Sequence, residues 1–136
     1  MLNAAKKQHV TSVVLDASAL LAVLLEERGA AKVEALRASW VISAVNYSEV
    51  VATALERGLT LEELTPALLQ LPMEIVPFDA EQACLCASFK AVTRPLGLSL
   101  GDRACLALGL KRSLPVVTAD RAWEPAGVGP QVIQIR

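Results

Sequence analysis

Histidine is nearly absent from this sequence of 136 residues, in which His9 is the only one. His9 lies in the polar stretch 1–11, which has no hydrophobic periodicity, so we expect residues 1–11 to form a flexible N-terminal tail. A general base needs a fixed position, and a histidine on a flexible tail does not have one. The sequence therefore argues against Ser-His-Asp, Cys-His and paired-histidine ribonuclease mechanisms, and any chemistry would be carried by acids or metals.

Cysteine is scarce, and an excess of basic charge is lacking. The three cysteines, Cys84, Cys86 and Cys105, are odd in number and do not have the spacing of zinc ligands, so we expect buried, reduced thiols in a cytoplasmic protein. A net charge of −1 excludes a protein that holds nucleic acid by overall charge alone. Any contact with nucleic acid would need local basic residues or bound metal.

No apolar run reaches the ~18 residues of a membrane span, and Asp16 interrupts the apolar segment 13–25, which argues against a secretory signal. We therefore expect a soluble, cytoplasmic protein. Apolar residues make up 54% of the chain and charged residues 20%, which excludes disorder and indicates one folded domain over residues 12–136. So high an apolar content also predicts some apolar surface that meets a partner.

Short apolar segments alternate with Ala- and Leu-rich segments along the chain. We expect strands near residues 12–15, 40–43, 74–77, 116–118 and 132–135, and helices near residues 18–26, 30–38, 46–56, 60–71, 79–92 and 99–111. This alternation predicts an α/β fold with three layers, α/β/α, around a central, mainly parallel sheet of four to five strands.

Helix starts are marked by short polar motifs. Thr60 with Glu63 and Asn46 with Glu49 have the spacing of a capping box, and Asp79 with Gln82 has it as well. We expect each pair to begin a helix.

Four acids stand at the predicted junctions of strands and helices. Asp16 follows the first strand, Glu49 lies early in the third helix, Asp102 begins the sixth helix, and Asp120 ends the fourth strand. Each acid alone could be an ordinary helix cap or turn residue. A parallel sheet, however, brings the ends of its strands to one edge, where α/β proteins bind ligands.

A cluster of four carboxylates needs compensation. Two carboxylates ~4 Å apart repel by about 4 kcal/mol at an effective dielectric of 20, and a divalent cation would offset that repulsion. Mg²⁺ and Mn²⁺ prefer oxygen ligands, which the chain offers without histidine. Hydroxyls near the acids could orient them, although local capping explains these equally well; they are Ser18, Ser99 and Thr118. Such a metal site suits phosphodiester hydrolysis.

The segments around these acids resemble the PIN domain, specifically the VapC-type toxins of toxin–antitoxin pairs. The matching segments are residues 14–21, 48–52, 98–104 and 117–123. The resemblance implies a Rossmann-like fold and a metal-dependent endoribonuclease that cuts RNA. It places Asp16, Glu49, Asp102 and Asp120 at a Mg²⁺ or Mn²⁺ site as catalytic and metal-binding residues, with Ser18 and Thr118 in support.

The resemblance also implies partners. It predicts a homodimer and a small VapB-like antitoxin whose C-terminal segment occupies the active-site groove and offers a basic side chain to the acids. For RNA contact the nearest basic residues are Arg103 and Arg121, followed by Arg94 and Lys90, and each of them could equally be a solvated surface residue.

Two other functions are weighed against this one. A catalytically silent PIN-like module that binds RNA or protein would share the fold. A phosphotransfer protein with Asp16 as nucleophile is disfavoured, because haloacid-dehalogenase-like phosphatases expect a second acid where Ser18 stands, and the acid pair and late lysine of response-regulator receivers are missing.

Overall fold

The computed structural model describes residues 12–136, apart from the side chains of residues 124–126. The predicted tail, residues 1–11 with His9, lies outside the described residues. Five strands form one sheet in the order β3-β2-β1-β4-β5, and every neighbouring pair is parallel. The strands are β1 Ser12–Leu15, β2 Ser39–Ser43, β3 Met73–Val76, β4 Val116–Thr118 and β5 Val132–Gln134. The predicted three-layer α/β fold with a parallel sheet is confirmed.

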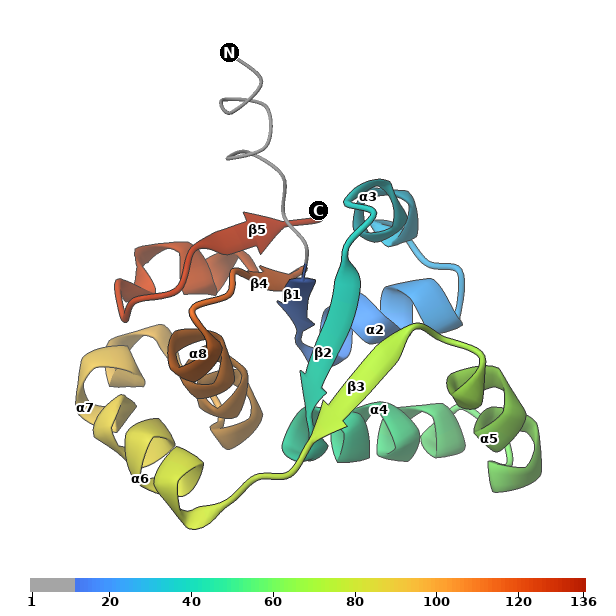
Figure 1. Cartoon of the computed structure of the whole chain (residues 1–136), viewed down its shortest axis with the longest axis horizontal. Helices are drawn as coiled ribbons and strands as arrows, with labels where there is room; N and C mark the ends of the chain where they lie inside the picture. The colour runs from blue at the N-terminus through green and yellow to red at the C-terminus, as the bar shows by residue number, and fades with distance from the viewer. Residues whose placement is uncertain (1–11) are drawn as a thin grey trace.

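Helices cover both faces of this sheet (Figure 1). The α-helices are α2 Ala17–Leu24, α3 Ala30–Ala35, α4 Ala44–Glu56, α5 Leu61–Leu69, α6 Ala80–Ser88, α7 Lys90–Thr93 and α8 Leu100–Arg112, and the 3₁₀ helices are η1 Arg94–Leu96 and η2 Arg121–Ala126. Successive residues of a strand point to opposite faces, so Val13 and Leu15 pack in the core on the side of α2 and α4, whereas Val14 packs on the side of α8. The three central strands, β2, β1 and β4, are buried on both faces over most of their length, as their continuous apolar residues predict, whereas β3 at the edge is partly exposed.

The parallel register brings three strand ends to one edge of the sheet. Leu15 pairs with Val117, and the backbone N–H of Asp16 donates to Val117 O at 3.1 Å. The last residues of β2 and β4, Ser43 and Thr118, are both fully buried. The segments that follow β1, β2 and β4 therefore all begin at the same edge of the sheet.

The predicted capping box of Asn46 and Glu49 is wrong. Helix α4 begins at Ala44, and its N-cap is Ser43, whose Oγ accepts from Val45 N at 3.2 Å. Strand β2 passes directly into the helix, so the last strand residue supplies the cap. Asn46 is left inside the first turn with its side chain free for another contact.

Two further expectations need correction. The helix predicted over residues 79–92 is interrupted at Phe89, between α6 and α7, and the Gln82 amide donates to Pro77 O at 3.1 Å instead of completing a capping box. Asp79 does cap α6, through Gln82 N at 2.9 Å. Cys84 is exposed, so only Cys86 and Cys105 are buried thiols, and all three are free. Among the described helices none is long and apolar enough to cross a membrane.

Candidate active site

Asp16 occupies the junction between β1 and α2 and is only 4% exposed. Its carboxylate accepts Ala19 N at 2.8 Å, which makes Asp16 the N-cap of α2. Two hydroxyls donate to the same carboxylate, Thr118 Oγ1 at 2.6 Å from Oδ2 and Ser18 Oγ at 2.7 Å from Oδ1. Burial raises the pKa of Asp16 to about 6, the hydrogen bonds from Thr118, Ser18 and Ala19 oppose this rise, and the charge of Asp102 adds to it.

The two hydroxyls are themselves fixed by the backbone that follows β4. Ser18 Oγ accepts from Ala119 N at 2.9 Å, and Thr118 Oγ1 accepts from Asp120 N at 3.0 Å. Each hydroxyl thus accepts a hydrogen bond from a backbone N–H that follows β4 and donates one to the Asp16 carboxylate. The orientation of this carboxylate is therefore fixed by hydrogen bonds from Ser18 Oγ, Ala19 N and Thr118 Oγ1.

Glu49 lies on α4 and reaches the start of α8. The Asn46 amide, which is 1% exposed, donates from Nδ2 to Glu49 Oε1 at 3.1 Å and to Gly101 O at 2.9 Å. The Glu49 carboxylate lies where a Cβ of residue 101 would be, so only glycine fits there without displacing it. Burial raises the pKa of Glu49, the hydrogen bond from Asn46 opposes this, and the charge of Asp102 adds to it.

Asp102 and Ser99 form a capping box at the start of α8. Ser99 N donates to Asp102 Oδ2 at 2.8 Å, and Asp102 N donates to Ser99 Oγ at 3.2 Å. Burial raises the pKa of Asp102, its bonds to Ser99 lower it, and the charge of Asp120 raises it further. Asp102 is therefore the acid whose charge interacts with the other three.

Cys105 lies one turn after Asp102 on α8. Its thiol is fully buried, and its pKa is raised well above the usual value by burial and by the negative charges of Asp16, Asp102 and Glu49. The charges of three acids from three different elements therefore act on one buried side chain. The structure brings these three predicted site residues together.

The remaining predicted residues lie at the margin. Asp120 is exposed and caps η2, with its Oδ1 accepting Ala122 N at 2.9 Å, and Arg121 beside it is exposed. Arg103 is half-buried and turned to α6, where Nη1 donates to Cys86 O at 3.2 Å. This contact commits Arg103 to helix packing, so of the two arginines only Arg121 faces solvent freely.

The acids fit a divalent metal in chemistry but are not assembled around one. In the described part of the chain, no three Asp, Glu, Cys or His side chains are arranged to hold a metal ion. The carboxylates of Asp102 and Asp120 each accept a backbone hydrogen bond at a helix start, from Ser99 N and Ala122 N respectively. The donors are all oxygens, which divalent cations prefer. Burial raises the pKa values of Asp16, Glu49 and Asp102, and the charge of a neighbouring acid adds to each rise, so a bound cation would favour their ionised forms.

Sequence reasoning missed three residues of this cluster: Asn46, Gly101 and Cys105. The spacing of Asn46 and Glu49 is that of a cap and so hides the contact of Asn46 with α8, and the contacts of Gly101 depend on how α4 packs on α8. Cys105 could have been found, because it stands three residues after Asp102 and so shares its helix face.

The sequence pattern described as the PIN domain matches residues 13–127, which include all four acids. The chain belongs to the PIN domain family. No curated protein matches the sequence.

Solved structures share the architecture of this PIN domain. A chain of the DNA-bound VapBC structure from Salmonella typhimurium aligns at 19% identity with a TM-score of 0.72, covering 93% of this chain and 99% of that chain. A toxin–antitoxin complex from Klebsiella pneumoniae aligns at 18% identity and 0.69, covering 91% and 98%. VapBC-5 from Mycobacterium tuberculosis aligns at 23% identity and 0.60, covering 93% and 98%. At these identities the similarity concerns the fold of the PIN domain.

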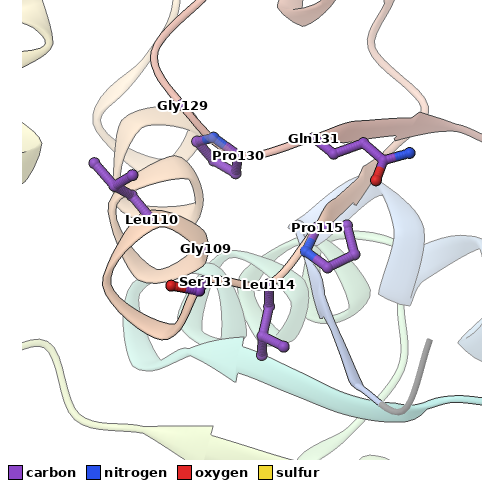
Figure 2. A pocket seen from close by; sticks show the side chains of 8 residues that line it. All are labelled: Gly109, Leu110, Ser113, Leu114, Pro115, Gly129, Pro130 and Gln131. Atoms are coloured by element: carbon purple, nitrogen blue, oxygen red, sulfur yellow. The ribbon is translucent and has the colours of Figure 1, made fainter. Parts of the chain in front are cut away.

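A pocket of the PIN domain is lined by none of the four acids. This pocket of about 320 Å³ lies between the C-terminal half of α8 and the segments that lead into β4 and β5 (Figure 2). Leu110, Pro115 and Pro130 are among its lining residues. These segments enter their strands, so the pocket is at the edge of the sheet opposite Asp16.

Proposed function

We propose that this PIN domain is a divalent-metal-dependent endoribonuclease that hydrolyses RNA phosphodiester bonds and acts as the toxin of a toxin–antitoxin pair. The observation that carries the proposal is that the Asn46 amide joins Glu49 to Gly101, the residue before Asp102, while the negative charge of Asp102 also acts on Asp16. In the described part of the chain none of these three acids forms an ion pair with a basic side chain. Membership of the PIN domain family supports the same function.

Asp16, Glu49, Asp102 and Asp120 would hold Mg²⁺ or Mn²⁺. When bound by carboxylates, such a metal lowers the pKa of its water and stabilises negative charge on a phosphate. Asp16 is already fixed by Ser18 and Thr118, whereas Asp102 and Asp120 would exchange cap hydrogen bonds for the cation.

Other residues would orient or bind the substrate. Ser99 would hold Asp102 in place through the capping box, and Ser18 and Thr118 would orient Asp16 through their hydroxyls. Arg121, exposed next to Asp120, is the basic residue best placed to meet an RNA phosphate at this edge. Arg103 would contribute positive charge near Asp102 while its side chain keeps its hydrogen bond to Cys86 O on α6.

We further propose a VapB-like antitoxin and a homodimer. The similar folds belong to chains from VapBC and toxin–antitoxin complexes, which supports the first partner. A basic side chain of an antitoxin would neutralise the acids that lack ion pairs, and Leu100, 53% exposed in the same turn as Asp102, offers it apolar contact. Exposed Leu61 and Leu69, at 57% and 79%, leave apolar surface for a second copy.

Cleavage of a mixed cellular RNA pool by purified, partner-free protein tests the nuclease. The protein is assayed with Mn²⁺, with Mg²⁺ and with EDTA, alongside Asp16→Asn. We expect discrete fragments that require metal and are lost in the variant, while its circular dichroism matches that of the parent. Undiminished metal-dependent cleavage by Asp16→Asn would overturn the assignment, and no cleavage by folded protein under any condition would favour the silent binding module.

A further inference from the structure

The Asn46 amide joins the two helices that carry Glu49 and Asp102. It is buried on the first turn of α4, and its Nδ2 donates both along its own helix, to Glu49 Oε1 at 3.1 Å, and across to Gly101 O on α8 at 2.9 Å. Both partners are acceptors only, so the NH₂ group must face them. The orientation of the amide is therefore determined by its two contacts.

The other end of the same amide is unsatisfied. Asn46 Oδ1 is buried and has no hydrogen-bond partner among the described residues. A buried acceptor without a partner costs free energy, which an apolar side chain of similar size would avoid. What the amide contributes is therefore at its donor end, where it holds Glu49.

Gly101 contributes to the position of Glu49 because it has no side chain. The Glu49 carboxylate occupies the position that a Cβ of residue 101 would take, and all three atoms nearest to that position belong to the Glu49 side chain. The backbone of Gly101 is helical, so alanine would suit it as a conformation. A methyl group at residue 101 would therefore displace the Glu49 carboxylate without straining the helix itself.

We infer that Asn46 and Gly101 form a seat that positions the Glu49 carboxylate in the acid cluster. The inference rests on the proposed metal-dependent function. Both are positioning residues, because they act on the site only through Glu49. Asn46 holds the carboxylate by a hydrogen bond, and Gly101 leaves the space that it fills.

Replacing Asn46 tests the first half of the seat. We expect Asn46→Ala to weaken Mn²⁺ binding about tenfold, measured by isothermal titration calorimetry, as loss of a residue that orients a metal ligand does. The matched control is Gln82→Ala, because Gln82 is also a buried amide with an unpaired oxygen and one donor bond to a backbone carbonyl. Gln82 makes no hydrogen bond to the four acids, so its variant should bind Mn²⁺ within twofold of the parent.

Replacing Gly101 tests the second half by a different physical change. Gly101→Ala adds a methyl group where Glu49 lies and should weaken Mn²⁺ binding by a similar factor, while the melting temperature stays the same or rises because alanine favours the helix. A general loss of folding would lower both quantities together. The two substitutions act on one carboxylate, so their effects should not add.

A Glu49→Ala background separates positioning from other effects. There, Asn46→Ala and Gly101→Ala should each change Mn²⁺ affinity by less than twofold, because the carboxylate they position is gone. Full Mn²⁺ affinity in folded Asn46→Ala, or an undiminished effect in the Glu49→Ala background, would overturn the inference.

A final measurement needs neither metal nor activity. In NMR spectra of the metal-free protein, the two Nδ2 protons of Asn46 should exchange slowly with solvent, and Glu49→Ala should shift the resonance of one of them. Exchange at the rate of a free amide would overturn the seat. If the parent protein cuts no RNA and binds no Mn²⁺ but these protons are protected, the proposed function fails and the seat stands.

Discussion

Asp16 makes the stability of the metal-free protein depend on pH. Burial raises the pKa of its carboxyl from the ordinary value of 3.8 to about 6. A pKa that is higher in the folded state means that folding favours the protonated carboxyl, so the stability tied to protonation is complete below pH ~4 and is lost as the pH rises through 6. The difference between the two pKa values corresponds to about 3 kcal/mol.

Asp16→Asn removes this dependence, because the amide stays neutral at every pH. We expect the free energy of unfolding of the variant, relative to the parent in EDTA, to rise by up to about 3 kcal/mol between pH 4 and pH 7 and then to level off. Urea denaturation at a series of pH values measures it. Saturating Mn²⁺ should reverse the order, because it stabilises only a protein that binds it.

Glu74 provides a control of the opposite sign. The hydrogen bond from Arg112 lowers the pKa of Glu74, so its contribution to stability is present at neutral pH and is lost as the pH falls. Glu74→Gln should therefore be less stable than the parent at pH 7, by a small amount because the pair is on the surface. A pH-independent difference for Asp16→Asn would contradict the burial of an uncompensated carboxyl.

At the scale of the element, the chain offers two matched helix caps. Thr60 caps α5 and Ser99 caps α8, each in a complete capping box and each exposed. Replacing either by alanine should cost about 1 kcal/mol of stability. Only α8 carries a predicted metal ligand in its first turn, so only Ser99→Ala should also weaken Mn²⁺ binding severalfold.

Thermal denaturation and calorimetric titration of the two cap variants check this prediction together. Equal losses of stability with unequal Mn²⁺ affinity would show that the first turn of α8 belongs to the site. Equal losses of both quantities would mean that Mn²⁺ affinity simply follows global stability.

The strands and most helices could be predicted because local chemistry decides them. The strand of Ser12–Leu15 and the caps at Thr60 and Ser99 follow from apolar runs and capping spacing. The start of α4 could not be predicted in this way, because Ser43 ends a buried strand and caps a helix at once. The break between α6 and α7 at Phe89 could not be predicted either. The Phe89 side chain is only 8% exposed, so tertiary packing rather than local sequence decides the break.

In the candidate site, too, contacts between adjacent strands could be predicted, whereas contacts that depend on helix packing could not. Asp16 and Thr118 could be expected to meet because their strands are adjacent and parallel, and their side chains do form a hydrogen bond. The contacts of Asn46 and Gly101 could not be expected, because residues 55 positions apart meet only through the packing of α4 on α8. Whether the four acids act as metal ligands remains a prediction.

At the scale of the whole molecule, the last residues close the chain onto its first loop. Ile135 is 2% exposed, and its side chain and carbonyl oxygen lie 2.9 Å from the position of a Cβ on Gly29. Arg136 Nε donates to Arg28 O at 2.7 Å, and Arg136 also forms an ion pair with Glu27 at 3.6 Å. The β5 end of the sheet is thereby tied to the loop between α2 and α3.

Gly29→Ala should loosen this closure. Its φ of 104° is left-handed, and the added methyl would collide with Ile135, so the variant bears a conformational cost of roughly 1–2 kcal/mol and an overpacking cost of similar size. Gly58 has a similar φ of 95° with nothing within 4 Å of its Cβ position, so Gly58→Ala bears only the first cost. Urea denaturation should show Gly29→Ala to be the less stable variant by about 1–2 kcal/mol, with Mn²⁺ affinity unchanged in both. Equal losses for the two glycines would mean that Ile135 moves aside freely and that the C-terminal residues do not hold the α2–α3 loop in place.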